Sequence, residues 1–342
     1  MTSAPGNSFG KALILTTFGE SHGRAVGGIL DGFPSGIPID TEFVQTELGR
    51  RRPGDDPFSS PRKEEDKLEI LSGLYEGIST GAPIAFLVFN RDQRPSDYDH
   101  LRDVYRPSHG DFTWHMKFGI RDHRGGGRAS ARETVARVAG GALAKIFLRT
   151  RNITVEAQIV QIGSHRIQDA GCGIHDDKIA AYLQQMKEAG DTVGGIISCK
   201  IRGVPPGLGE PVFDKLQADL GKAMLSIGTA RGFEYGSGFA AASMTGSEHN
   251  DRFINDQGKI RTHTNHSGGI QGGISNGEEI VFRVAFKPVS TLMSDQESVN
   301  VAGEPVTIRG TGRHDVCVVP RAVPVVEAMA ALVIADHLIR CR

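Results

Sequence analysis

The feature that most constrains the fold is a segment that occurs twice. Residues 77–88 and residues 273–284 share the pattern G-I-S-x-G-x-x-I-x-F-x-V, a glycine-containing turn followed by alternating apolar positions. Alternation with a period of two is typical of a strand with one buried face. The two copies therefore predict hairpins and a pseudo-symmetric internal repeat, the alternative being that two hairpins share the pattern by chance.

Other segments carry clear helix signals. Asp40 is a good N-cap for a helix that runs to Leu48. Ser130 and Glu133 form a capping-box pattern before an apolar stripe that lasts to about Leu148. Further helices are predicted over 177–189, 213–227 and 324–338, strands over 13–17, 153–162 and 196–201, and a long irregular region over 233–276. Strands interleaved with helices and joined by hairpin turns predict an α+β fold with antiparallel sheets.

The most unusual composition lies in residues 106–132, RPSHGDFTWHMKFGIRDHRGGGRASAR, which contain five arginines and three histidines. A glycine-rich turn before a helix start presents free backbone N–H groups, and guanidinium groups bind phosphate and carboxylate oxygens bidentately. The chain has 27 arginines but only 12 lysines at a net charge of −1, which favours a focused anion pocket over a basic surface. The alternative is that Arg121, Arg124 and Arg137 are surface residues paired with Asp122 or Glu133.

The remaining composition excludes several classes of protein. At 342 residues, 39% hydrophobic and 23% charged, the chain is typical of a soluble globular protein, and its near-neutral charge argues against nucleic-acid binding. The four cysteines lack metal-ligand spacing and are expected to be reduced, as in the cytoplasm. No signal peptide and no apolar run of about 18 residues is evident, so no membrane association is expected.

Common catalytic motifs are also missing. The sequence contains no P-loop, no Rossmann fingerprint, no HExxH pattern and no zinc-type spacing, and no metal site is predicted. What remains is a set of arginines, glycine-rich loops and the acid–base candidates His22, His109 and Asp315. Taken alone, His22 is more often a turn or core histidine, and the Arg50–Arg52 run is more often a solvated loop. Together they indicate an enzyme that acts on a phosphorylated, carboxylated small molecule.

At this point the motifs resemble those of the chorismate synthase family. The resemblance extends in order from about Phe9 to the C-terminus, so chance agreement is excluded. Its motifs are GESHG at 19–23, RRRPG at 50–54, RPSHGD at 106–111, RDHRGGGRASARET at 121–134, and GRHD at 312–315 followed by Cys317.

The resemblance implies the last common step of the shikimate pathway of aromatic amino acid biosynthesis. In this anti-1,4 elimination, 5-enolpyruvylshikimate 3-phosphate loses phosphate and a C6 hydrogen to give chorismate. It also implies reduced FMN as cofactor, with NADPH possible as reductant. The implied architecture is a β-α-β sandwich with helices between antiparallel sheets, formed by residues 1–342 as a single domain and assembled as a homotetramer.

The resemblance also assigns roles to individual residues. His22 matches the residue that protonates the departing phosphate, His109 the residue beside flavin N1 that counters charge on the reduced ring, and Asp315 the acid that relays a proton from flavin N5. The implied substrate-binding residues are Ser21, Arg51, Arg106, Ser130, Arg132 and Arg313. The implied cofactor-binding residues are Arg51, Arg128, Ala129, Ser130, Glu248, His249, Gly272, Lys287, Pro288, Val289, Ser290, Thr291 and Arg313.

Some positions depart from the family pattern. Relatives carry other residues at Ser108, Gly110, Ala129 and the Glu248–His249 pair, and many have a ligand-contacting arginine where Pro57 stands. A carboxylate at position 248 would repel a flavin phosphate unless it points elsewhere, and Arg62 is a candidate replacement for the arginine missing at Pro57. Two alternatives stay open: a non-catalytic flavin- or phospholigand-binding protein on the same scaffold, and nucleic-acid binding through the arginines, which would show a steep salt dependence.

Overall fold

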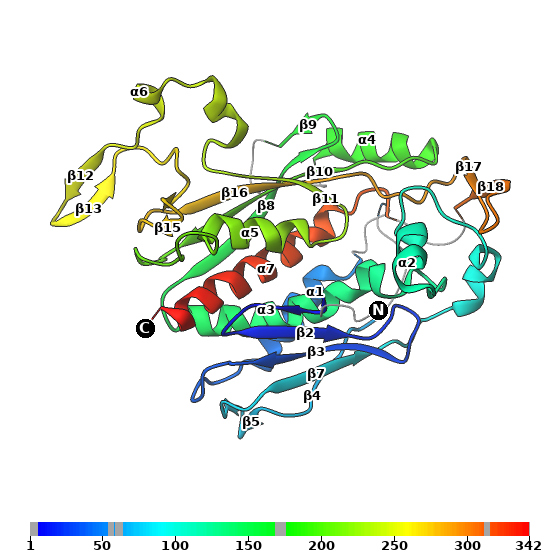
Figure 1. The fold of residues 1–342 in the computed structure, drawn as a ribbon, viewed down its shortest axis with the longest axis horizontal. Helices are drawn as coiled ribbons and strands as arrows, with labels where there is room; N and C mark the ends of the chain where they lie inside the picture. The colour runs from blue at the N-terminus through cyan, green and yellow to red at the C-terminus, as the bar shows by residue number, and fades with distance from the viewer. Residues whose placement is uncertain (1–5, 54–57, 59–63, 168–175, 311–314, 342) are drawn as a thin grey trace.

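The computed structural model describes residues 6–53, 58, 64–167, 176–310 and 315–341. Two five-stranded antiparallel sheets enclose a layer of helices (Figure 1). The first sheet has the order β1 (Ser8–Phe9), β2 (Ile14–Phe18), β3 (Ala25–Asp31), β7 (Ile84–Phe89), β4 (Leu68–Ile70). The second has the order β11 (Ala230–Tyr235), β16 (Ile280–Phe286), β10 (Gly195–Arg202), β8 (Thr154–Ile162), β9 (His165–Arg166). The predicted α+β class and antiparallel sheets are confirmed.

Helices and small hairpins complete the chain. The helices between the sheets are α1 (Thr41–Arg51), α3 (Thr134–Arg149), α5 (Leu216–Leu225) and α7 (Val319–Arg340). The other helices are α2 (Asp111–Phe118), α4 (Asp177–Glu188) and α6 (Gly246–His249), and the 3₁₀ turns include η1 (Pro95–Leu101), η2 (Gly127–Ala129), η3 (Ala131–Glu133) and η5 (Gly238–Ser243). The hairpins pair β5 (Leu74–Tyr75) with β6 (Ile78–Ser79), β12 (Phe253–Asp256) with β13 (Lys259–Thr262), β14 (Ile270–Gln271) with β15 (Ile274–Ser275), and β17 (Asp295–Val299) with β18 (Pro305–Arg309).

The repeated sequence pattern forms the same structure twice. Each copy begins with a two-residue strand, β6 or β15, which is the second strand of a small hairpin. It continues into a central strand of a large sheet, β7 or β16. The order β2, β3, α1, β4, β5, β6, β7, α3 recurs as β8, β10, α5, β11, β14, β15, β16, α7, with the other elements inserted. The corresponding strands also lie in the same order within the two sheets. The predicted pseudo-symmetric repeat is therefore confirmed, and it extends beyond the matching residues.

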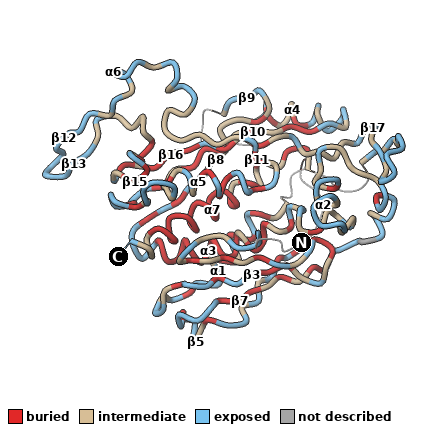
Figure 2. The backbone as a smooth tube through the Cα atoms, in the orientation of Figure 1, coloured by how far each residue is buried: buried red, intermediate tan, exposed pale blue. Residues whose placement is uncertain are grey.

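The apolar residues that the two copies of the repeat share lie in the core. The I, F and V of the pattern are Ile84, Phe86 and Val88 in one sheet and Ile280, Phe282 and Val284 in the other, and all six are at most 1% exposed. Burying one such side chain contributes about 1.5–3 kcal/mol to folding. Figure 2 shows that the buried backbone is concentrated in the inner strands and the helix layer, and the hairpins are exposed.

The central pair of helices, α3 and α7, forms the middle of the molecule. A Cβ added to Gly141 would lie 2.3 Å from Cβ of Ala328, so the two helices approach too closely there for any other residue. The sequence predicted one apolar face on α3, but nearly all residues of this helix are buried. The reason is that α3 packs against both sheets and against α7. Helix α7 has an 18-residue window with a mean hydropathy of 1.8, contrary to the expectation that no such run exists, and 83% of that window is buried inside the protein. It is the core helix of the fold.

Helix boundaries show where local signals suffice. Asp40 caps α1 as predicted, because its carboxylate accepts a hydrogen bond of 2.9 Å from Phe43 N. Helix α5 starts at Leu216, three residues later than expected. The predicted start of the last helix at Pro324 is wrong, because α7 already begins at Val319. Proline 324 lacks an N–H and breaks one helical hydrogen bond, but burial among the other helices outweighs that loss.

Candidate active site

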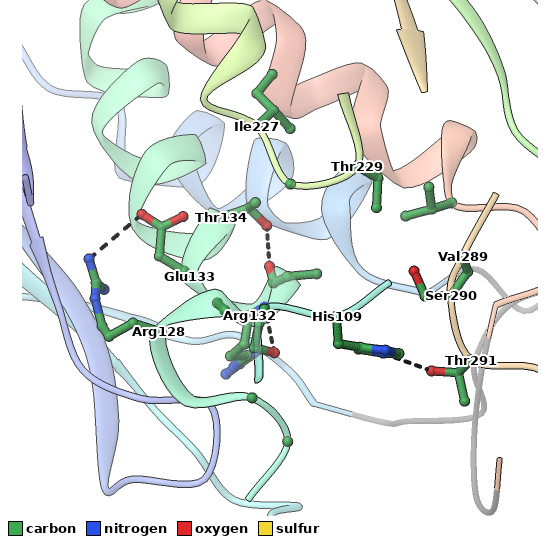
Figure 3. Close-up of a pocket in the computed structure, with 18 of the residues that line it drawn as sticks. His109, Arg128, Arg132, Glu133, Thr134, Ile227, Thr229, Val289, Ser290 and Thr291 are labelled. Carbon is green, nitrogen blue, oxygen red and sulfur yellow. Dashed lines mark hydrogen bonds and ion pairs between the residues drawn. The ribbon is translucent and has the colours of Figure 1, made fainter. Parts of the chain in front are cut away.

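One cavity of about 1,470 Å³ lies beside the N-terminal halves of α3 and α7. It is larger than the roughly 300–1,000 Å³ of a pocket for one small ligand, so it has room for two. Figure 3 shows His109, Ser290 and Thr291 on one side, Arg128 and Glu133 on another. The predicted site residues that line it are His22, Arg51, Arg106, His109, Arg128, Ala129, Ser130, Arg132, Lys287, Val289, Ser290, Thr291 and Asp315.

His22 is held by the glycine-rich turn. A Cβ added to Gly125 would lie 2.4 Å from Cε1 and Nδ1 of the His22 ring, and Gly125 has a φ of +62°. Ser21 N donates to Gly127 O at 3.4 Å, and the His22 and Tyr98 rings pack at an interplanar angle of 63° with their centroids 4.8 Å apart. At least one of the three glycines is therefore required for steric reasons, because it lets the two loops touch.

The sequence suggested that the glycine-rich turn leads directly into an α-helix, and this prediction is wrong. The 3₁₀ turns η2 and η3 come first, and the predicted capping box is not formed. Ser130 Oγ accepts from Arg132 N at 3.4 Å, but Glu133 does not reach back. Its carboxylate instead accepts hydrogen bonds from Arg137 Nε at 2.8 Å and Thr17 Oγ1 at 3.0 Å, because β2 lies within reach.

His109 stands at the tip of a loop closed by an ion pair. Arg106 donates from Nε and Nη2 to the two carboxylate oxygens of Asp111, both at 2.8 Å. His109 Nδ1 lies 2.9 Å from Pro107 O, which can only accept, so Nδ1 carries a proton. The other ring nitrogen, Nε2, lies 3.3 Å from Thr291 Oγ1.

The environment of His109 disfavours its charged form. Burial, and next the positive charge of Arg106, lower its pKa to about 4. The ring is therefore neutral near pH 7 in the absence of a ligand. The predicted role, countering negative charge on a reduced flavin, requires that an anionic ligand first raise this pKa.

The predicted segment Lys287–Thr291 lies against the His109 loop. Ser290 Oγ donates to Ser108 O at 3.2 Å, and Thr291 contacts His109 as described. These residues are separated by about 180 positions in the sequence, and only the fold brings them together. Within the segment, Pro288 does not line the cavity.

The cavity also contains Thr229, which the sequence did not reveal. Thr229 has a φ of +72°, an unusual conformation for a β-branched residue, and its carbonyl accepts from Lys287 N at 2.9 Å. The left-handed conformation costs about 1–2 kcal/mol for an L-residue. Strain of this kind is concentrated at functional sites.

Arg128 connects the turn to the first sheet. Its guanidinium donates to Thr17 Oγ1 at 2.7 Å and to Gly19 O at 3.3 Å. Ala129 and Ser130, which follow it, also line the cavity. The segment predicted to contact the cofactor is thus anchored next to the loop that carries His22.

Arg51 and Arg132 share a carboxylate that the sequence did not suggest. Asp66 Oδ2 accepts from Arg51 Nη2 at 2.6 Å, and Asp66 Oδ1 accepts from Arg132 Nη1. Arg132 also pairs with Glu64. Burial, with the neighbouring charges of Arg321 and Arg132, lowers the pKa of Arg51 to about 10. The only signal in the sequence was the acidic run Glu64–Asp66, to which no role was assigned.

Asp315 has an arginine partner at the start of α7. Arg321 Nη1 lies 2.5 Å from Asp315 Oδ2, and Arg321 Nε donates to Arg51 O at 3.3 Å. Arg321 also lines the cavity. It was missed because the predicted helix began at Pro324, which left Arg321 in an unassigned loop.

Three further predicted cofactor contacts, besides Pro288, do not lie at this cavity. Glu248, His249 and Gly272 are absent from its lining, and α6 with the β12–β13 hairpin extends away from the sheets as an arm (Figure 1). Glu248 does point elsewhere, because its carboxylate accepts from Thr245 N and Oγ1, both at 2.8 Å. These hydrogen bonds lower the pKa of Glu248.

The other predicted residues fall into two groups. Ser21 is buried behind Gly125 and does not line the cavity. Arg313, Pro57 and Arg62 lie outside the described residues.

The alternative pairing with Asp122 or Glu133 holds for Arg124 and Arg137, but it is wrong for Arg121, whose side chain is only 7% exposed. Arg121 Nη2 donates to three backbone carbonyl oxygens, those of Leu101, Arg102 and Val104, at 2.7–2.8 Å. Arg124 pairs with Asp122 and Arg137 with Glu133, as the alternative proposed. These three arginines therefore stabilise loops and helices.

The fold and the cavity define a class of protein. A cavity of this volume, lined by buried arginines, by His22, His100 and His109 and by a carboxylate paired with an arginine, suits an enzyme that binds a polyanion and moves protons. Among the described residues, no group of three or more His, Cys, Asp or Glu side chains is placed to hold a metal ion.

Comparisons with known proteins identify the family. The family model described as chorismate synthase matches residues 13–339. The chain is 55% identical to a chorismate synthase of Bacteroides thetaiotaomicron, covering 97% of both chains, and 56% identical to one of Cytophaga hutchinsonii, covering 98% of both. A crystal structure of chorismate synthase superimposes with a TM-score of 0.76 at 31% identity, covering 97% of this chain and 92% of that one. The chain belongs to the chorismate synthase family and is a lyase of aromatic amino acid biosynthesis.

Proposed function

We propose that this enzyme eliminates phosphate from 5-enolpyruvylshikimate 3-phosphate in the cavity beside α3 and α7, giving chorismate. The proposal is supported by the position of the predicted acid–base residues in the fold. His22, His109 and Asp315 come from three distant segments, and all three line the same cavity as the arginines expected to hold the substrate.

The chain's own groups have distinct tasks in this proposal. Arg51, Arg106 and Arg132 bind the phosphate and carboxylates, and their effect on the leaving phosphate is strengthened because the surrounding protein excludes water. His22 donates a proton to the departing phosphate. Asp315, held by Arg321, accepts a proton at its carboxylate.

Arg106 has a second task. Its Nε and Nη2 are engaged by Asp111, so it contributes to ligand binding through its remaining N–H groups. The same ion pair closes the loop that carries His109. Arg106 is therefore expected to affect both substrate binding and the position of the histidine.

We further propose reduced FMN as the cofactor, and the residues present fit it. The cavity has room for a second ligand, and Arg128, Arg231 and Lys287 supply positive charge for a phosphate. When bound, reduced FMN supplies electron density that side chains cannot. NADPH is the proposed source of reducing equivalents where the enzyme reduces the flavin itself.

We propose a cytoplasmic homotetramer in which the arm completes a neighbouring site. Glu248 and His249 on the arm, together with Gly272 of the β14–β15 hairpin, would then contact the flavin of another subunit, which accounts for their absence from the cavity of their own chain. Reduced thiols are in keeping with the cytoplasm, and Cys199 is buried. The absence of nucleic-acid binding and the single domain over 1–342 stay predictions.

The test is anaerobic phosphate release from 5-enolpyruvylshikimate 3-phosphate, followed together with chorismate absorbance. We expect equal amounts of both products with dithionite-reduced FMN and none with oxidised FMN. NADPH with oxidised FMN, without dithionite, then tests the reductase activity. If FMN and substrate bind but neither product forms, the chain is a non-catalytic binding protein and the proposal is wrong.

A further inference from the structure

Asp66 lies between two arginines that come from different parts of the fold. It is 2% exposed and accepts from Arg51, the last residue of α1, and from Arg132 in η3. Its own backbone is fixed, because Gln45 Nε2 donates to Asp66 O at 3.1 Å and Gln45 Oε1 accepts from Leu68 N at 3.1 Å. Asp66 is thus tied to α1 and positioned independently of any ligand.

The charges around Asp66 depend on one another. Burial raises the pKa of a carboxyl group, but the guanidinium groups of Arg51 and Arg132 hold the pKa of Asp66 below its usual value. Conversely, two buried guanidinium groups without a shared anion would repel each other. Arg132 is held further by Glu64 and by a hydrogen bond of 2.9 Å from its Nε to Asn90 Oδ1.

Two guanidinium nitrogens of this arrangement lack a hydrogen bond among the described residues: Arg132 Nη2, which is ion-paired with Glu64, and Arg51 Nε. Arg51 Nε is buried and has no hydrogen-bond partner among the described residues, and the Arg51 side chain is only 4% exposed. The great majority of buried hydrogen-bond donors in proteins have a partner, and an exception calls for an explanation. Since Arg51 lines the cavity, the simplest partner is an oxygen of a bound anion.

We propose that Asp66 is a positioning residue for anion binding: it holds Arg51 and Arg132 in register through one side of each guanidinium and leaves Arg51 Nε for the ligand. The class of ligand is a phosphorylated or carboxylated small molecule. The identity of the substrate rests on the proposed function, whereas the arrangement of Asp66 and the two arginines does not.

The experiment compares Asp66→Asn and Asp66→Glu with a matched control, using the full-length enzyme with reduced FMN. Asp336→Asn is the control, because Asp336 is equally buried and accepts from three backbone N–H groups but does not line the cavity. For Asp66→Asn, we expect the KM for 5-enolpyruvylshikimate 3-phosphate to rise about 10- to 100-fold, the range for losing one hydrogen bond to a charged group, with kcat changed far less. Asp66→Glu keeps the charge and is expected to raise KM by a smaller factor.

A second readout uses inorganic phosphate without turnover. If Asp66 positions Arg51 and Arg132 for anion binding, its removal should weaken the binding of inorganic phosphate. Phosphate should therefore raise the Tm of Asp66→Asn less than that of the wild type or Asp336→Asn. A purely structural Asp66 predicts a lower Tm with equal phosphate shifts in all three proteins.

A wild-type KM in Asp66→Asn would overturn the proposal, as would equal phosphate shifts in the three proteins. If Asp66→Asn does not fold, a wild-type KM in Asp66→Glu would overturn it. If the wild type releases no phosphate from the substrate, the proposed function fails. The Tm comparison then still decides the role of Asp66.

Discussion

Two buried charge networks, a short distance apart along α1, serve different purposes. The core network consists of Glu47, Arg50, Lys145 and Glu327, and it connects α1, α3 and α7. The pocket network consists of Arg51, Asp66, Arg132 and Glu64, and it lines the cavity. Adjacent residues, Arg50 and Arg51, thus belong to different networks because successive side chains of a helix point in different directions.

The core network satisfies its own hydrogen-bonding groups. All four carboxylate oxygens of Glu47 and Glu327 accept hydrogen bonds, and Lys145 Nζ donates to both residues at 2.5 and 2.6 Å. Glu327 Oε1 also accepts from Ala157 N of β8 at 2.9 Å, which ties the helix layer to the second sheet. A buried network of this kind holds elements in one arrangement.

The pocket network differs in that Arg51 Nε stays unpaired among the described residues. Both networks contain buried charges of both signs. Only the pocket network borders the cavity and has a hydrogen-bond donor, Arg51 Nε, that no described residue pairs with. Burial of charge therefore does not distinguish the two networks, whereas the adjoining cavity and the unpaired Arg51 Nε do. Removing a group from each network should therefore affect different properties.

Lys145→Met should give the largest effect on stability. It leaves two buried carboxylates with Arg50 as their remaining cation, so the free energy of unfolding should fall by about 3–5 kcal/mol, as for other broken buried pairs. Urea unfolding measures the loss, and phosphate release per folded molecule should stay close to that of the wild type. Arg202→Met, which breaks the surface pairs with Glu156 and Glu279, is the control and should change the free energy of unfolding by less than about 1 kcal/mol. A loss below about 1 kcal/mol for Lys145→Met would remove the contrast between the networks.

His22→Ala and His109→Ala test the pocket side of the comparison. Each should lower kcat by roughly 10²- to 10⁴-fold, the range for a general acid or base, while the proteins still fold and bind substrate. Single-turnover phosphate release and substrate titration separate the two effects. His165→Ala, a substitution at a histidine away from the cavity, should retain full turnover. Near wild-type rates in both cavity variants would refute the assigned roles.

The pH dependence of His109 sharpens the comparison further. Its pKa of about 4 lies below the ordinary 6.5, so the fold favours the neutral ring. The resulting stability is fully present above about pH 6.5 and is lost as pH falls towards 4. NMR of histidine-labelled protein should show a titration midpoint near 4 without ligand and a higher one with reduced FMN. A midpoint near 6.5 in the free protein would contradict the assigned burial.

Thr229→Gly should give the smallest effect, and it extends the comparison from charge to backbone. Relief of left-handed strain of about 1–2 kcal/mol, less the entropic cost of glycine of about 0.5–1 kcal/mol, should stabilise the protein by about 0.5–1 kcal/mol. The loosened turn should also weaken FMN binding, measured by quenching of flavin fluorescence. Asn152→Gly is the control, a left-handed position in the turn before β8 where asparagine is better tolerated. A lower Tm for Thr229→Gly would show that the conformation is not strained.

Local sequence patterns were enough to identify the central strands of the repeat and the start of α1. Alternation with a period of two identifies the buried face of β7 and β16, because neighbouring side chains of a strand point to opposite sides. The cap of α1 at Asp40 is equally local, since the contact spans three residues. His22, His109 and Asp315 were found because their motifs are contiguous, although their assigned roles stay predictions.

The surroundings of the site residues depend on contacts between distant segments and could not be predicted from the sequence. Asp66 meets Arg132 across 66 positions of sequence, and Arg321 meets the end of α1 across 270, so no local pattern announces either contact. The start of α7 and the absence of the capping box were likewise decided by packing, which outweighs local preference. The low pKa of His109 has the same origin, because burial and the charge of Arg106 arise only when the chain has folded.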